Sequence, residues 1–135
     1  MKQQVLKFLK EYSTLPLEVD RLIVSTFITV NNLRINNNIY LKQYQILENN
    51  SVEYSNLNKF VSIVNQEILN FGLEDLIELF EFVISPSDRI VNGAIYTPSE
   101  IRSYIISQSF RKIGNQLINA KIADISCGCS GFLYS

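Results

Sequence analysis

The sequence contains no histidine and no tryptophan, and only two of its 135 residues are cysteine. A catalytic Cys–His pair is therefore impossible, and Cys127 and Cys129 have no imidazole with which to complete a tetrahedral zinc site within one molecule. We expect no metal site, and we expect Cys127 to pack as a small apolar side chain behind a turn. Five glycines and three prolines are also too few for a collagen-like or low-complexity chain.

Long apolar runs and a net positive charge are missing as well. The longest apolar run, LIVSTFITV at residues 22–30, is shorter than the roughly 20 residues that span a bilayer. The lysine-bearing amino terminus has no apolar core of signal-peptide length. We therefore expect a cytoplasmic protein with reduced thiols and no membrane partner. The formal net charge is −1, so no overall basic field attracts nucleic acid, and most contacts with any DNA partner are expected outside this chain.

Hydrophobic residues make up 47% of the chain, which is enough for a globular domain with a buried core. Through the first ninety residues they recur at helical spacing. The spacing predicts an amino-terminal helix with the apolar stripe of Val5, Leu6 and Leu9, helices over 17–32 and 39–47, and helices with apolar faces over 57–71 and 73–84. Gly72 is expected to end the fourth helix in the left-handed conformation. The fourth and fifth helices are expected to form an antiparallel pair.

Ser-Pro-Ser-Asp at residues 85–88 interrupts the helical pattern and indicates a boundary. We therefore predict a helical amino-terminal region over 1–88 and a different region over 89–135. Charge is uneven, because every charged residue in 67–81 is acidic whereas residues 102–121 are predominantly basic. Two interpretations stay open: solvated helix faces, or a docking surface for a partner.

Thr97-Pro98-Ser99-Glu100 has the pattern of a capping box with proline at the first helical position, and predicts a helix that starts at Thr97. The free N–H groups at such a start suit a ligand carboxylate. Alternatively, the cap only stabilises the helix, by about 1 kcal/mol.

Lys-Ile-Ala-Asp-Ile-Ser at residues 121–126 is typical of a short buried strand with Asp124 near its carboxyl end. A glycine-bearing turn follows at 127–131, and Phe132 would open the next helix. In open α/β sheets ligands bind at the carboxyl ends of strands, next to such turns. Asp124 can equally be a turn or capping residue.

Two of these stretches together resemble a known family. Residues 92–98, Asn-Gly-Ala-Ile-Tyr-Thr-Pro, resemble the Gly-x-x-Tyr-Thr-Pro element that precedes the catalytic domain of DNA adenine methyltransferases in restriction-modification systems. Residues 123–133 resemble the first S-adenosylmethionine motif of those enzymes, Asp-Pro-x-Cys-Gly-x-Gly-x-Phe-Leu. The preceding segment is similar to their helical lead-in, so the resemblance covers about 73–135.

The resemblance implies a fold, a cofactor and a set of site residues. The chain would be mainly α, with a helical amino-terminal region followed by the first strand and glycine turn of a Rossmann-like α/β methyltransferase domain. Tyr96 and Thr97 would belong to the cofactor site, with Thr97 at the amino-acid end of S-adenosylmethionine, and Asp124 would hold the ammonium group of that end. Gly128 would let the backbone approach the methionine part, and Phe132 would line the pocket.

The family pattern is neither perfect nor complete here. Ile125 replaces the usual proline, and Ser130 replaces the second glycine and can crowd the cofactor. The acid that holds the ribose and the Asn/Asp-Pro-Pro-aromatic motif that holds adenine are missing, so we expect an inactive amino-terminal fragment with no catalytic residue. DNA is the expected partner of the complete protein, with a specificity or nuclease subunit as a further one. The alternative is a helical interaction module of a restriction-modification complex that uses no cofactor.

Overall fold

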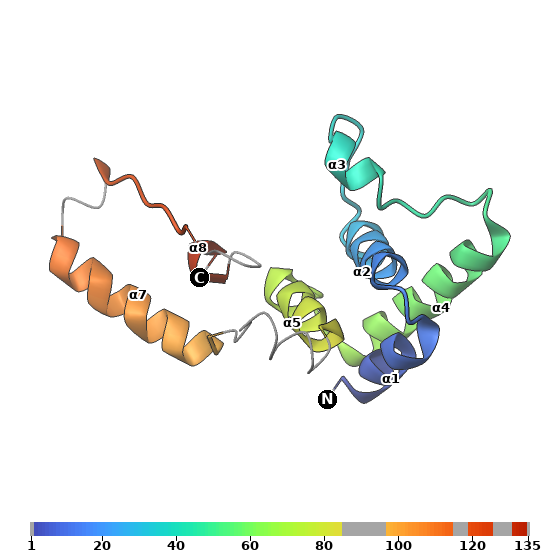
Figure 1. Cartoon of the computed structure of the whole chain (residues 1–135), viewed down its shortest axis with the longest axis horizontal. Helices are drawn as coiled ribbons and strands as arrows, with labels where there is room; N and C mark the ends of the chain where they lie inside the picture. Colours follow the sequence, from blue (N-terminus) through green and yellow to red (C-terminus); the bar gives the residue numbers. More distant parts are fainter. Residues whose placement is uncertain (1, 85–96, 115–118, 126–130, 135) are drawn as a thin grey trace. The chain divides into compact units, whose positions relative to one another are not determined.

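The computed structural model describes residues 2–84, 97–114, 119–125 and 131–134, and it divides the chain into two compact units, Met1–Ser85 and Pro86–Ser135 (Figure 1). All regular secondary structure in the described residues is helical, which confirms the prediction of a mainly α chain. The first unit contains α1 (Gln3–Tyr12), α2 (Pro16–Val30), α3 (Ile39–Lys42), α4 (Ser51–Glu67) and α5 (Leu73–Val83), and the second contains α7 (Ser99–Ile113) and α8 (Gly131–Tyr134). No described helix is both long and apolar enough to cross a membrane.

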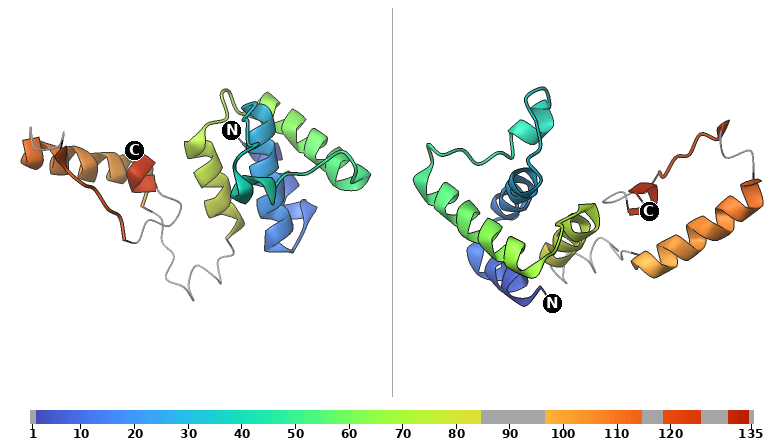
Figure 2. Two further views of the ribbon diagram at one scale, coloured as in Figure 1. Left: turned by 90° about the horizontal axis from the view of Figure 1, so that it is seen from above. Right: turned by 180° about the vertical axis from the view of Figure 1, so that it is seen from behind.

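Helices α1 and α2 each pack against both α4 and α5, which joins the first unit into one body (Figure 2). The predicted antiparallel pairing of the fourth and fifth helices is therefore wrong, because these helices make their main contacts with α1 and α2. The joint between them supplies the reason. Ile68 and Phe71 lie in this joint and are 7% and 2% exposed. The joint thus belongs to the core itself, and the two helices diverge from it.

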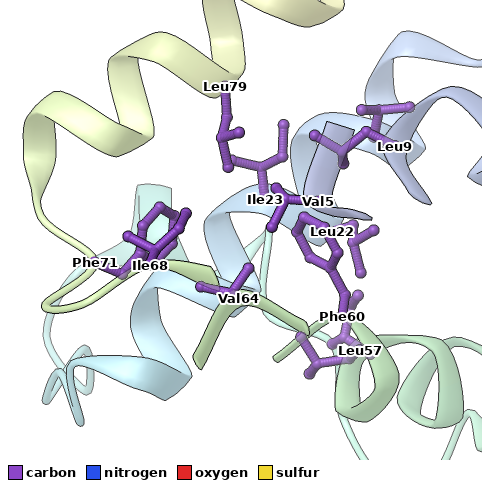
Figure 3. Close-up of a cluster of buried hydrophobic side chains, with 12 residues drawn as sticks. Val5, Leu9, Leu22, Ile23, Leu57, Phe60, Val64, Ile68, Phe71 and Leu79 are labelled. Atoms are coloured by element: carbon purple, nitrogen blue, oxygen red, sulfur yellow. The ribbon is translucent and has the colours of Figure 1, made fainter. Parts of the chain in front are cut away.

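The core of the first unit gathers apolar side chains from α1, α2, α4, α5 and the segment before α4 (Figure 3). Phe60 of α4 is fully buried and stacks on Phe8 of α1, with ring centroids 5.2 Å apart. Phe27 of α2 meets Phe71 edge-on at 5.6 Å. Each fully buried side chain of this size stabilises the fold by about 1.5–3 kcal/mol. The spacing of apolar residues therefore identified the buried faces of α1 and α4, whereas on α5 the fully buried Leu79 lies outside the predicted stripe and Leu73, which the stripe included, is 39% exposed.

The third helix is much shorter than predicted, and the structure corrects its end from residue 47 to Lys42. Ser25 of α2 is buried and explains the difference. Its hydroxyl donates to the carbonyl of Tyr44 at 2.6 Å and accepts from the N–H of Ile46 at 2.8 Å. In a longer helix these backbone groups would form hydrogen bonds within the helix, but here they form hydrogen bonds with the Ser25 hydroxyl instead.

The turn after α4 also differs from the prediction. The helix ends at Glu67, and Asn70, with φ of 61°, is the residue that adopts the left-handed conformation. Gly72 has φ of −100° and precedes the first residue of α5, where its N–H donates to Asp75 Oδ2 at 2.9 Å. Gly72 therefore begins a helix rather than ending one. Asparagine tolerates the left-handed region better than most residues, so no glycine is required there.

In the second unit, α7 begins at Ser99, one residue later than the predicted first helical residue, Pro98. Pro98 has ψ of 148° and is the residue before the helix, and its carbonyl accepts the first helical hydrogen bond from the Arg102 N–H at 3.0 Å. No side chain caps this end. The predicted capping box at Thr97 is therefore wrong, because an extended Pro98 cannot occupy the first helical position.

Residues 120–125 have no regular structure, so the expected buried strand at 121–126 is absent from its described part. Ile122 is 59% exposed and Ile125 is fully exposed. A strand needs neighbours that pair its N–H and C=O groups, and no strand occurs among the described residues to provide them. Helix α8 follows and packs against α7.

Candidate functional site

The predicted cofactor-binding residues fall in the second unit. Thr97 is half-buried just before α7, Asp124 is half-buried in the irregular segment, and Phe132 is half-buried in α8. Tyr96 and Gly128 lie outside the described residues, as do the predicted boundary at 85–88, both cysteines and Ser130. The contact between α7 and α8 associates the helix that follows Thr97 with the helix that carries Phe132. Asp124 lies on the segment between these helices and takes part in an interaction of its own.

Arg102 is a buried cation at this site, and the sequence analysis assigned it only to a basic stretch. The residue is 5% exposed, so it does not belong to a solvated face. Its Nη1 donates to the backbone carbonyl of Thr97 at 3.0 Å. The side chain therefore folds back over the start of the helix that carries it. The sequence signal that could have pointed to Arg102 is its place in the second turn of the predicted helix as the first basic residue after Glu100.

The start of α7 has two features that attract an anion. The first turn has no side-chain cap, so its leading N–H groups stay available and carry the positive end of the helix dipole. The Arg102 guanidinium adds a positive charge beside Thr97, where it already donates to the Thr97 carbonyl and takes part in a further interaction. The carboxylate of an amino acid suits this combination, and a carboxylate such as that of Asp124 suits the ammonium group of the same ligand.

The hollows on the first unit differ in chemistry from this site. One, beside α2 and the start of α4, is lined by Arg21, whose Nη1 lies 3.3 Å from Glu53 Oε1. Another, along α4, is lined by Tyr54 among others, and the Tyr54 hydroxyl donates to Glu48 Oε1 at 3.0 Å. This hydrogen bond raises the pKa of Tyr54.

The acidic segment at 67–81 has partners within the first unit. Glu67 accepts from the N–H groups at the start of α1, and Lys2 forms ion pairs with Asp75, at 2.7 Å, and with Glu78. Burial lowers the pKa of Lys2, but the hydrogen bonds to both carboxylates outweigh it and raise the pKa overall. Glu74 and Glu81 also take part in interactions. These contacts account for much of the acidic segment, so its charges are not all available to a docking partner.

Within the ranges that the structure describes, no three acidic, histidine or cysteine side chains come together as metal ligands. No family model, no curated protein and no solved structure matches this chain. Its functional assignment therefore rests on its own residues and their geometry.

Proposed function

We propose that this chain is the amino-terminal part of a cytoplasmic DNA adenine methyltransferase of a restriction-modification system. Residues 1–88 form a helical lead-in, and residues 89–135 begin the S-adenosylmethionine-dependent domain. The complete protein transfers a methyl group from the sulfonium of the cofactor to the exocyclic amine of adenine. One observation carries the proposal: α7 begins directly after the Tyr-Thr-Pro element with an uncapped first turn, and the buried Arg102 lies on the Thr97 carbonyl.

Each site residue then has a physical role. The first turn of α7 and Arg102 attract the cofactor carboxylate, and Asp124 holds its ammonium group through a charge-assisted hydrogen bond. The Phe132 ring covers the apolar part of the methionine chain, next to the turn at Gly128. In the complete domain, neighbouring strands would pair the backbone of 121–126 and bury its isoleucines, which are exposed here.

Methyl transfer needs an adenine amine that is positioned in line with the sulfonium and polarised by hydrogen bonds. This chain contains no Asn/Asp-Pro-Pro-aromatic motif that could hold the amine. We therefore expect the 135 residues to be inactive alone, with DNA, and a specificity or nuclease subunit, bound through the complete protein.

The first test is to read the coding DNA beyond the Ser135 codon. A continuing frame is expected to encode an acid after a second strand and the Pro-Pro motif. The longer product is expected to transfer labelled methyl to DNA, and the 135-residue chain is not. In the longer product, Asp124→Asn is expected to weaken S-adenosylmethionine binding about tenfold or more in calorimetric titration. Asp20→Asn makes the same chemical change in the first unit and serves as the matched control. Equal affinity of the two variants would remove Asp124 from the site.

The alternative function is that of a helical interaction module without a cofactor, and the surface of α7 favours this alternative. Ile101, Tyr104 and Ile105 are 50%, 65% and 43% exposed, an apolar face that suits a partner protein. A stop codon directly after Ser135, together with a folded monomer in light scattering, would favour this module. Methyl transfer by a longer product would favour the enzyme.

A further inference from the structure

Residues 21–47 form a stretch of the first unit without any acidic residue. Arg21 at its beginning is paired with Glu53. Arg34 and Lys42 are exposed, and neither forms an ion pair with a described residue. The first unit therefore presents two unneutralised cations on one connecting segment, although the chain as a whole carries a net charge of −1.

Polar and aromatic side chains surround these cations. Tyr40 and Ile39 of α3 are 73% and 72% exposed, and the amides of Asn36 and Asn37 face solvent just before the helix. We call these residues the α3 surface: Arg34, Asn36, Asn37, Ile39, Tyr40 and Lys42. Figure 1 shows α3 beyond the end of α2 and on the opposite side of the unit from α1. Cations, amides and an exposed aromatic ring are the side chains that nucleic-acid surfaces use.

The backbone beneath this surface is held in place. Ile35 and Ile46 are 6% and 5% exposed and anchor both ends of the segment. Asn38 caps α3, because its Oδ1 accepts from the N–H groups of Tyr40 and Leu41 at 3.1 and 3.0 Å. Ser25 of α2 fixes the segment after α3 by hydrogen bonds to two of its backbone groups, the carbonyl of Tyr44 and the N–H of Ile46. The exposed side chains therefore project from a fixed frame, which reduces the entropy lost on binding.

We propose that the α3 surface binds the phosphate backbone of duplex DNA. Arg34 and Lys42 contact phosphates, the asparagine amides donate to phosphate oxygens or base edges, and Tyr40 packs against the sugar edge. The choice of DNA as the partner rests on the proposed function. Charge complementarity supports this choice, because the α3 surface carries Arg34 and Lys42 within a stretch that has no acidic residue to repel a phosphate.

The test measures binding of the 135-residue chain to a fluorescent DNA duplex at several salt concentrations. Weak affinity is expected, with Kd of about 1–100 µM at low salt, and log K should fall with log salt with a slope near −1.8 for two phosphate contacts. Arg34→Gln/Lys42→Gln is expected to weaken binding about tenfold or more at about 50 mM salt and to remove most of the slope. Amide resonances of α3 should shift on titration with the duplex.

Lys7→Gln/Lys59→Gln is the matched control, because it removes two exposed cations from α1 and α4. It is expected to retain at least half of the affinity. Equal losses of DNA affinity in the two double variants would mean that only net charge matters, and would overturn the proposal that the α3 surface binds DNA. A chain that does not bind the duplex would also overturn it, and would leave the α3 surface to a protein partner. Tighter binding of single-stranded than of duplex DNA would overturn it as well. Circular dichroism establishes that each variant is folded.

The failures of the two proposals are distinguishable, because this binding needs neither cofactor nor catalysis. Duplex binding that depends on Arg34 and Lys42, in a longer product that transfers no methyl group, would overturn only the proposed function. Methyl transfer by a longer product in which the α3 substitutions leave Kd for DNA unchanged would overturn only the present inference.

Discussion

Glu67, the last residue of α4, accepts hydrogen bonds at Oε2 from the N–H groups of Gln4 and Val5 at the start of α1, at 2.9 and 3.0 Å. The residue that precedes α1, Lys2, provides no side-chain cap. A carboxylate from a distant helix therefore satisfies the first turn, and its charge also suits the positive end of the helix dipole. The same contact ties the two helices together.

Removal of this carboxylate should destabilise the fold. Glu67→Ala is expected to lower the free energy of unfolding by about 1–2 kcal/mol, as for loss of a helix cap, and urea denaturation followed by circular dichroism measures it. Glu11→Ala is the control, since Glu11 forms only an exposed pair with Lys7 at 3.9 Å and should cost almost nothing. Equal losses in both variants would show that Glu67 does not cap α1.

Substitutions at two neighbouring residues of α2, Ser25 and Thr26, should change the stability of the fold in different ways. Ser25→Ala leaves the carbonyl of Tyr44 and the N–H of Ile46 without their partner, and is expected to cost about 1–3 kcal/mol of stability. Thr26 is fully buried, and its hydroxyl has no hydrogen-bond partner. Thr26→Val keeps the shape and removes an unsatisfied polar atom, so it should be neutral or stabilising. Thermal melts of both variants test the pair, and a loss in Thr26→Val as large as that in Ser25→Ala would refute it.

The joint between α4 and α5 allows a second paired test. Asn70→Ala forces a Cβ-bearing residue without a local hydrogen-bonding side chain into positive φ, and should cost about 1 kcal/mol. At Gly72 the backbone is extended, and an added Cβ would meet its nearest atoms at 3.7 and 3.8 Å, which is ordinary contact. Gly72→Ala should therefore keep or raise stability, by reducing the entropy of the unfolded chain. A larger loss at Gly72 than at Asn70 would contradict this account of the turn.

Stability should also depend on the ionisation of Asp20. Burial raises the pKa of this carboxyl above its value in the unfolded chain. The folded state therefore holds the proton more tightly, so this group makes stability fall as pH rises from the unfolded pKa through the folded pKa. Asp20→Asn should consequently raise stability at pH about 7 relative to the unsubstituted chain and change it little at pH about 3, below both pKa values. Urea midpoints at the two pH values measure this, and an equal shift at both would exclude ionisation as the cause.

The helices of the first unit were predictable where short-range spacing governs them. Pro16 before an apolar run indicated the start of α2, and the buried face of α4 followed from intervals of three and four residues, but the burial of Leu79 in α5 did not. The candidate site was predictable only in part. The helix near Thr97 was predicted, but its start and its capping box were not correct, and the role of Arg102 was not apparent, because its burial depends on what packs around it.

Apolar periodicity by itself determined that this chain is mainly helical and which faces enter the core, since each helix needs only local hydrogen bonds and one buried stripe. Tertiary structure decided where α3 ends, that Asn70 rather than Gly72 turns left-handed, and that Glu67 caps α1. It also left residues 120–125 without a strand. The end of α3, the cap on α1 and the missing strand share one physical reason: each depends on hydrogen-bonding partners that lie far away in the sequence, or on neighbouring strands, and short-range spacing carries no information about such partners.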